Sequence, residues 1–321
     1  MKVLANDGIS KAGIARLEQA GFIVDTNKIE PENLIEGFNA GGYCGILVRS
    51  ATQVRKEMID ACPGMKFIGR GGVGMDNIDV DYARSQGIDV FNTPAASSQS
   101  VAELVMGHFF SIARGLHDAN RRMGDADGAG FGALKKKFGK GVELRGKKLG
   151  IIGFGRIGRS TASYALGCGM DVCAYDLHPS DEPVEVCVAG QTLEINIPFV
   201  DMAELIRTCD CISIHVPKQK DGSAVLGAAE MASMKDGVLL VNAARGGVID
   251  EAALLSALEG GKVAYAALDV FDNEPTPNKA LLTHDRISVS PHIGAATGEA
   301  QDRIGTELAE NIIRVMGVNV S

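Results

Sequence analysis

The chain has 321 residues, of which 45% are hydrophobic and 22% are charged, and its formal net charge is −8. A chain of this length can form two domains with sizeable cores, and the composition is typical of a soluble globular protein. The negative charge argues against nucleic acid or an anionic membrane as a partner, and no apolar run approaches the roughly 18 to 20 residues that span a bilayer.

The N-terminus and the cysteines indicate the compartment. The opening "MKVLANDGIS" lacks the charged region, long apolar core and small-residue cleavage site of a secretory signal. The seven cysteines are scattered, odd in number and without a CxxC pair at zinc-ligand spacing. We therefore expect a cytoplasmic protein with reduced cysteines and no metal site.

Short apolar runs alternate with helical patterns along the first half of the chain. Four runs lie at 2–6, 45–50, 66–70 and 89–94. They are apolar on both faces, which predicts buried parallel strands in βαβ units. A helical stretch follows from about 97 to 123. The segment 124–146 is Gly-rich and charged with poor periodicity, and it is predicted to be an exposed excursion.

The second half repeats the alternation. Six further runs are predicted as strands, at 147–153, 171–176, 211–217, 237–244, 263–270 and 287–292. A final helix is expected at about 297–316. Ten strands are many for one sheet, and the helix at 97–123 divides them, so the prediction is an α/β fold with two lobes. We expect the final helix to return to the first lobe, which makes that lobe discontinuous.

A glycine-rich motif joins the strand predicted at 147–153 to the next helix. Gly153, Gly155 and Gly158 have the GxGxxG spacing. The spacing alone is weak evidence in a chain with 40 glycines. Here an apolar strand precedes it, a helical pattern follows it, and Asp176 ends the next strand about twenty residues further on. The combination predicts a dinucleotide site rather than an ordinary tight turn.

The same motif indicates which cofactor binds. Gly155 would let the backbone approach the pyrophosphate, while amides around Arg156 and Ile157 at the helix N-terminus donate to its oxygens. A carboxylate at Asp176 would accept hydrogen bonds from the ribose and repel a 2′-phosphate; the alternative is a solvated residue at a strand end. We therefore predict NAD rather than NADP.

Three polar residues follow second-lobe strands at the edge where open α/β sheets bind ligands. They are Arg245, Glu274 and His292. Separately they could be a capping arginine, a turn glutamate and a turn histidine. Together they form an acid–base set: a guanidinium grips a carboxylate bidentately, and an imidazole exchanges a proton near neutral pH while a glutamate orients it. His292 is the predicted proton carrier.

Several linked stretches resemble the NAD-dependent D-2-hydroxyacid dehydrogenase family. They are "GRGGVGMDNID", "NTPAASSQSVAELVMGH", "LGIIGFGRIGR", "LLVNAARGGVIDEAALLSAL", "ALDVFDNEP" and "SPHIGAATGEAQ". The resemblance implies two Rossmann-like or flavodoxin-like domains, with the active site in the cleft between them. It implies a substrate-binding domain at 1–96 and 293–321, an NAD-binding Rossmann domain at 97–292, and a homodimer formed through the latter.

The resemblance also implies roles for single residues. It supports Arg245 as carboxylate clamp, Glu274 as partner of the histidine, and His292 as general acid/base. Substrate would contact Arg49, Gly72, Val73, Gly74, Arg245 and His292. Cofactor would contact Val73, Gly155, Arg156, Ile157, Asp176, Val216, Ala243, Arg245, Asp269, His292 and Gly294. In family members with phosphorylated substrates, the arginine matching Arg49 binds the phosphate; the alternative is a strand-end arginine paired with a surface acid.

Two departures from the family pattern qualify the expectation. Val216 and Val73 stand where threonine is common, so side-chain hydroxyl contacts are lost there. We expect no C-terminal regulatory domain, because the chain ends soon after the final helix. The expected activity is NAD-dependent oxidation of a small, phosphorylated 2-hydroxy acid. Alternatives are glyoxylate or hydroxypyruvate reduction, D-lactate oxidation, and a non-catalytic NAD-sensing corepressor.

Overall fold

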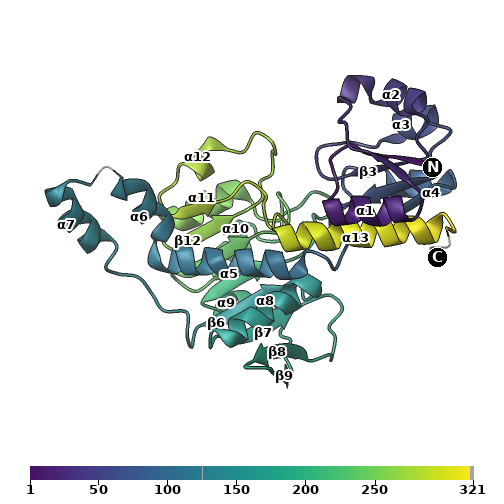
Figure 1. Ribbon diagram of the computed structural model, residues 1–321. Coiled ribbons are helices and arrows are strands. Elements are labelled where there is room, and N and C mark those ends of the chain that lie inside the picture. The colour runs from purple at the N-terminus through teal and green to yellow at the C-terminus, as the bar shows by residue number, and fades with distance from the viewer. Residues whose placement is uncertain (125, 319–321) are drawn as a thin grey trace. The chain divides into compact units, whose positions relative to one another are not determined.

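The computed structural model describes residues 1–124 and 126–318, which form two compact α/β units (Figure 1). One unit comprises Met1–Ser100 together with Ala295–Ser321, and the other comprises Val101–Gly294. The boundaries expected from the sequence lie at 96/97 and 292/293. Residue 125 of the expected excursion and residues 319–321 of the expected first domain lie outside the described residues.

The first unit contains a parallel sheet in the order β2-β1-β3-β4-β5. Its strands are β1 (Lys2–Ala5), β2 (Ile23–Asp25), β3 (Gly45–Val48), β4 (Phe67–Arg70) and β5 (Asp89–Asn92). The central strands are buried on both faces, which is why their sequences are apolar throughout. The strand order reverses between β1 and β3, so the loops after these two strands border a crevice of the kind that binds ligands.

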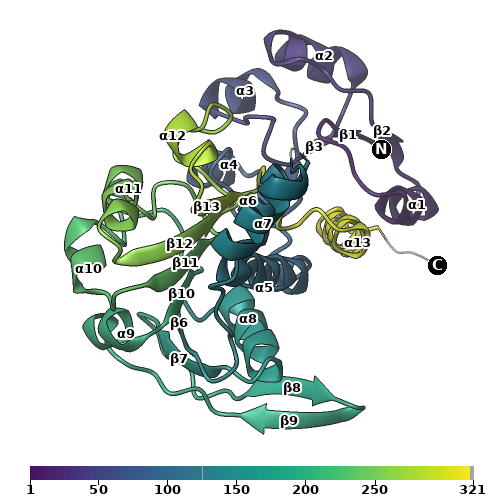
Figure 2. The ribbon, with the colours of Figure 1, turned by 90° about the vertical axis from the view of Figure 1, so that its left-hand side faces the viewer.

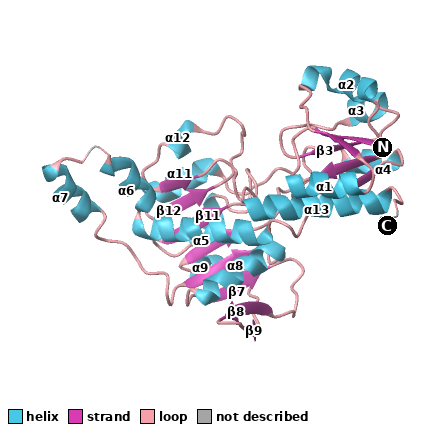
Figure 3. Cartoon of the chain, in the orientation of Figure 1, coloured by secondary structure: helices cyan, strands magenta, loops and turns pink. Residues whose placement is uncertain are grey.

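Helices cover both faces of this sheet (Figure 3). α1 (Lys11–Gln19) and α13 (Gly298–Val315) lie side by side on one face, where Leu17 and Ile312 join one apolar cluster. The short helix η1 (Pro31–Asn33) precedes α2 (Leu34–Gly41), which lies with α3 (Lys56–Ala61) and α4 (Val80–Ser85) on the other face. The expected final helix is confirmed as α13, with Thr297 as its N-cap.

The second unit contains a parallel sheet in the order β13-β12-β11-β10-β6-β7. Its strands are β6 (Lys148–Ile152), β7 (Asp171–Tyr175), β10 (Cys211–Ile214), β11 (Val238–Asn242), β12 (Val263–Leu268) and β13 (Ile287–Val289). All ten predicted strands are therefore present, and the predicted fold class is confirmed. The order reverses between β6 and β10, since β7 and β10 lie on opposite sides of β6.

Helices also cover both faces of the second sheet (Figure 2). α5 (Ser98–Arg114) and α8 (Arg156–Gly167) pack on one face, through residues such as Phe109 and Ala165. The other face is covered by α9 (Met202–Thr208), α10 (Ala228–Ser233), α11 (Glu251–Glu259) and α12 (Lys279–Leu282). The carboxyl ends of the strands are left for loops, and these loops carry most of the predicted site residues.

The region after α5 differs from the prediction. The helix expected over 97–123 is broken at Gly115, whose φ of 62° suits glycine, and it continues as α6 (Leu116–Met123). The expected excursion contains a helix, α7 (Gly128–Lys137). Asp118 of α6 accepts hydrogen bonds from Arg122 at 2.7 Å and Lys137 at 2.6 Å. Charged contacts rather than an apolar face connect α7 to α6, which explains why periodicity did not reveal it.

Three strands were not predicted. β2 has only three residues and lies at a sheet edge. β8 (Val184–Val188) and β9 (Gln191–Ile195) form an antiparallel hairpin outside the main sheets, and nearly all of β9 is exposed. Such strands lack the run of buried apolar side chains by which the other ten were recognised.

Candidate active site and cofactor site

The predicted dinucleotide motif forms the turn between β6 and α8. Gly153 has φ 91°. A Cβ on Gly158 would lie 2.3 Å from the carbonyl oxygen of Gly153, so only glycine lets the helix approach the turn this closely. A Cβ on Gly155, by contrast, would meet no atom within 4 Å. Gly155 therefore faces open space at the helix N-terminus, where a pyrophosphate could reach the backbone.

Asp176, Arg156 and Ile157 surround this turn. The carboxylate of Asp176, just after β7, accepts hydrogen bonds from the amides of Phe154 at 2.6 Å and His178 at 2.8 Å. Arg156 and Ile157 begin α8, so helix geometry gives their amides no partner within the helix. The carboxylate and these donors lie beside the point where the strand order reverses, which is where dinucleotides bind in such sheets.

His215, which sequence reasoning missed, lies against the same turn. A Cβ on Gly153 would come within 2.7 Å of the His215 carbonyl oxygen. The imidazole Nε2 lies 2.9 Å from Ser213 Oγ, while the buried Nδ1 has no partner among the described residues. Burial lowers the pKa of His215 to about 3, so the ring is neutral at ordinary pH. A buried nitrogen without a partner beside a glycine turn fits a site that a bound polar group completes.

The other predicted cofactor residues of this unit share one sheet edge. Val216 follows β10, Ala243 follows β11, Asp269 follows β12, and Gly294 closes the loop after β13. Val73 belongs to the first unit. The glycine turn, the N-terminus of α8, Asp176 and the strand-end residues of this unit are together suited to binding NAD.

Glu274 and His292 form the central contact of the site. His292 Nδ1 lies 2.8 Å from Glu274 Oε2. The other carboxylate oxygen of Glu274 accepts a hydrogen bond from the amide of Phe271 at 3.0 Å. Because a carboxylate only accepts, Nδ1 carries the proton and Nε2 of the neutral ring keeps a lone pair. About 39% of the His292 side chain is exposed, so the ring is accessible to a substrate.

The backbone of His292 is held by Asp269, which is 1% exposed. The amide of His292 donates to the Asp269 carbonyl at 2.8 Å, and the amides of Ile293 and Gly294 donate to its carboxylate at 2.9 Å. His292 has φ 54°, a left-handed conformation that a non-glycine residue adopts only where its surroundings enforce it. Asp269 therefore fixes the loop from which the imidazole projects, a role that the sequence did not indicate.

Arg245 lies in the neighbouring loop, after β11. Asn242, which sequence reasoning also missed, accepts from the amide of Ala244 at 3.0 Å and donates to the carbonyl of Arg245 at 2.9 Å. A Cβ on Gly246 would lie 1.9 Å from the carbonyl oxygen of Phe271. Glycine at 246 thus lets the arginine loop pack directly on the loop that leads to Glu274.

In the first unit, Arg49 directly follows β3. A hydrogen bond fixes its backbone, whereas its positively charged side chain lacks a carboxylate partner among the described residues. Its amide and that of Thr52 donate to Asp7 Oδ2 at 2.6 and 3.0 Å. Arg49 is half-buried, and its role toward a substrate phosphate stays a prediction. A Cβ on Gly71 would lie 3.6 Å from Arg49 Cγ, which places the side chain beside the predicted substrate loop.

The substrate loop itself is partly occupied by internal hydrogen bonds. Gly72, with φ 139°, donates its amide to Thr93 Oγ1 at 2.8 Å. Asn92 donates to the carbonyl of Val73 at 2.5 Å. Within the described chain, the amides of Val73 and Gly74 have no backbone partner. Of the three predicted loop residues, Val73 and Gly74 rather than Gly72 offer amides to an anion.

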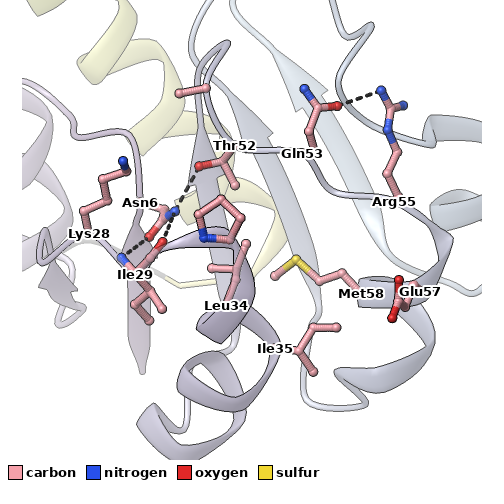
Figure 4. A pocket seen from close by; sticks show the side chains of 12 residues that line it. Asn6, Lys28, Ile29, Leu34, Ile35, Thr52, Gln53, Arg55, Glu57 and Met58 are labelled. Atoms are coloured by element: carbon pink, nitrogen blue, oxygen red, sulfur yellow. Dashed lines mark hydrogen bonds between the residues drawn. The ribbon is translucent and has the colours of Figure 1, made fainter.

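A separate pocket of about 250 Å³ lies beside the carboxyl ends of β1 and β3 (Figure 4). Asn6 donates to Thr52 Oγ1 at 2.9 Å and exchanges hydrogen bonds with the backbone of Ile29. These polar groups satisfy one another, and the rest of the lining combines apolar side chains such as Leu34 and Met58 with three charged ones. No predicted site residue lines it.

Among the residues that the structure describes, no group of three or more His, Cys, Asp or Glu side chains is placed to hold a metal ion. In the same residues, no helix combines the length and hydropathy needed to cross a membrane.

Comparison with known proteins gives consistent matches. Residues 106–294 match the family model described as D-isomer specific 2-hydroxyacid dehydrogenase, NAD binding domain. A hydroxypyruvate reductase of Thermotoga maritima is 43% identical over 85% of this chain and 85% of its own length. A D-3-phosphoglycerate dehydrogenase of Archaeoglobus fulgidus is 39% identical over 98% of this chain, which spans 57% of that protein.

The fold comparison points to the same group. The holo form of Rhodotorula graminis D-mandelate dehydrogenase superposes with a TM-score of 0.85 at 26% identity, covering 98% of this chain and 93% of that one. The chain spans little more than half the length of several of the relatives that it matches, and most of the length of others.

Proposed function

The chain belongs to the family of NAD-dependent, D-isomer specific 2-hydroxyacid dehydrogenases, and we propose that it oxidises 3-phosphoglycerate to 3-phosphohydroxypyruvate. The contact that carries the proposal is the 2.8 Å pair of His292 and Glu274 at the carboxyl edge of the cofactor-binding sheet. It supplies a positioned base beside a dinucleotide site, which is what oxidation of an alcohol requires.

The proposed chemistry assigns one task to each residue. His292 Nε2 takes the hydroxyl proton, while Nδ1–H remains bonded to Glu274, which stabilises the charged ring that results. Bound NAD supplies the hydride acceptor. Arg245 holds the substrate carboxylate and polarises the carbonyl that develops at C2. In the reverse direction, the charged ring of His292 returns the proton.

The specific substrate is proposed on the basis of Arg49. A half-buried guanidinium with no carboxylate partner among the described residues favours an external anion. The amides of Val73 and Gly74 lie in the loop beside it and would bind a further anionic oxygen. A substrate with a phosphate and a carboxylate suits this arrangement better than one with a carboxylate alone. We place the reaction in serine biosynthesis on this basis.

Hydroxypyruvate reduction is the second candidate. The relative from Thermotoga maritima that bears this name matches the chain over 85% of both lengths, whereas the phosphoglycerate dehydrogenase matched over 98% of this chain is much longer. The same three residues would perform the chemistry. The candidates differ in whether Arg49 has a phosphate to bind.

A homodimer and a cytoplasmic location complete the proposal. Large apolar side chains are exposed along α5, α6, α7 and the segment that follows, namely Phe110, Leu116, Met123, Phe131 and Val142, each 44% to 55% exposed. Contact with a second copy would bury them, and these residues lie in the NAD-binding unit. All seven cysteines are free thiols in the described residues, in keeping with a reducing compartment.

The experiment that tests the proposal is the change in NADH absorbance during turnover with a panel of 2-keto and 2-hydroxy acids. Turnover of any such acid supports a dehydrogenase, and preference for the phosphorylated acid supports the specific reaction. Binding of NADH without turnover of any of them would instead favour a non-catalytic NAD sensor.

A further inference from the structure

A buried histidine outside the predicted site is hydrogen-bonded to the loop that carries His292. His108 lies on α5 and is 7% exposed, among apolar neighbours on the face of α5 that packs on the sheet. Its Nε2 lies 2.9 Å from Ser290 Oγ and its Nδ1 lies 3.3 Å from Ser288 Oγ. Ser290 in turn donates to Asp269 Oδ1 at 2.5 Å. The contacts join residues about 180 positions apart in the sequence.

The direction of each hydrogen bond follows from the number of protons that each side chain can donate. The single hydroxyl proton of Ser290 goes to the carboxylate of Asp269. Ser290 Oγ must therefore accept from His108, so Nε2 carries the ring proton. Burial lowers the pKa of His108, against the opposing effect of nearby Asp269, and keeps the ring neutral. Nδ1 then accepts from the hydroxyl of Ser288. All donors in the network therefore point in the same direction: Ser288 donates to His108, His108 to Ser290, and Ser290 to Asp269.

Asp269 connects this network to the backbone of His292, the proposed acid/base residue. Its carboxylate accepts from Ser290 and from the amides of Ile293 and Gly294, while its carbonyl accepts from the amide of His292. The left-handed backbone of His292 lies between these anchors. If the carboxylate rotated, the amides on the C-terminal side of His292 would lose their acceptor, and the imidazole would shift relative to Glu274.

We propose that His108 is a positioning residue for His292, acting by donating to Ser290 and thereby fixing the rotamer of Asp269. The inference rests on the proposed function, in which His292 exchanges the substrate proton. His108 does not touch the reacting atoms. It determines how well the loop 290–294 is held, through a donor that an apolar side chain of similar size cannot replace.

The test compares His108→Met, which removes the donor at similar volume, with His108→Gln, whose amide nitrogen can replace Nε2. Loss of one such bond should lower kcat about three- to ten-fold in His108→Met, with KM for the acid within about two-fold, and His108→Gln should retain at least half of the wild-type kcat. Ser290→Ala interrupts the same path at another atom. The double variant His108→Met/Ser290→Ala should be no slower than the slower single variant, because both changes act on one route.

A second readout does not depend on turnover. Hydrogen exchange of the Ile293 and Gly294 amides, which donate to the Asp269 carboxylate, should be faster in His108→Met than in wild type or His108→Gln at the same pH, since Ser290 no longer holds that carboxylate in place. Equal exchange rates in the Met and Gln variants, or losses of kcat that multiply in the double variant, would overturn the inference. If the wild type reduces no 2-keto acid but the exchange rates differ as expected, the proposed function fails and the positioning role stands.

Discussion

Glu274 holds His292 from a fixed position, because each oxygen of its carboxylate has its own partner. Oε1 accepts from the amide of Phe271 at 3.0 Å, and Oε2 lies 2.8 Å from His292 Nδ1. The carboxylate therefore cannot rotate without breaking a backbone contact. This relationship leaves Nε2 of the imidazole as the ring nitrogen that can accept a proton, and gives the site its proposed base.

Replacing the base itself should stop the chemistry without removing the cofactor. His292→Ala should lower kcat by roughly 10² to 10⁴, the usual contribution of general acid–base catalysis. NADH binding, followed by fluorescence, should stay close to wild type, because the glycine turn and Asp176 are unchanged. Activity that survives in this variant would show that the proton moves through another group.

Removing only the charge of Glu274 should slow the chemistry. In Glu274→Gln the amide can still approach the ring but no longer compensates the positive charge that the imidazole takes up with the substrate proton. A hydrogen bond to a charged group is worth about 1.5 to 3 kcal/mol, so kcat should fall roughly ten- to hundred-fold while KM for the acid changes little. The measurement is steady-state kinetics with the hydroxy and keto acids, and an unchanged kcat would contradict the pairing.

Asp176 should determine the choice between NAD and NADP. Asp176→Ala removes a carboxylate that would accept hydrogen bonds from the ribose and repel a 2′-phosphate. The preference for NAD over NADP should therefore become smaller. The ratio of kcat/KM for the two cofactors measures this. The variant also removes the acceptor for the Phe154 amide, so some loss with both cofactors is expected; an unchanged ratio would place the ribose elsewhere.

The contact between α6 and α7 should make that region sensitive to acid. Burial opposes ionisation of Asp118, but hydrogen bonds from Lys137 and Arg122 outweigh it and lower the pKa of the carboxyl. A lowered pKa stabilises the fold above the unfolded-state value of about 4, and this contribution is lost as the pH falls below it. The protection of the α7 amides against hydrogen exchange, measured relative to the intrinsic exchange rate at each pH, should therefore decrease in acid.

A pair of lysine variants controls this prediction. Lys137→Ala removes a direct contact to Asp118, whereas the neighbouring Lys136 is exposed and its side chain makes no hydrogen bond or ion pair with the described residues. Faster exchange in α7 is expected at neutral pH for Lys137→Ala and not for Lys136→Ala. The effect should be about 1 kcal/mol, because the lysine side chain is 44% exposed and solvent screens the pair. Equal exchange in both variants would contradict the role of Asp118.

The strands that position the site were predictable because burial on both faces leaves a continuous apolar run. β6, β10, β11, β12 and β13 each produce such a run, and their polar strand-end residues then mark one sheet edge. α7 and the β8–β9 hairpin could not be found in this way. The helix α7 contacts α6 through the charged side chain of Lys137 rather than through an apolar face, and strand β9 of the hairpin exposes most of its side chains.

The supporting contacts of the site were less accessible to sequence reasoning than its reacting groups. His108 resembles any single histidine on an apolar helix face, and its partners lie about 180 residues away. Gly72 was expected to contact the substrate, but its amide donates to Thr93 Oγ1 in the fold. Both depend on tertiary contacts between distant segments, which neither periodicity nor a local motif records.

The most direct test of the proposed reaction is the comparison of 3-phosphohydroxypyruvate with hydroxypyruvate, in wild type and in Arg49→Ala. The wild type should prefer the phosphorylated acid. The substitution removes a charge-assisted contact worth about 1.5 to 3 kcal/mol, so kcat/KM for 3-phosphohydroxypyruvate should fall roughly ten- to hundred-fold, while that for hydroxypyruvate stays nearly unchanged. An equal loss on both substrates would make Arg49 structural, and a wild type that prefers hydroxypyruvate would contradict the proposed substrate.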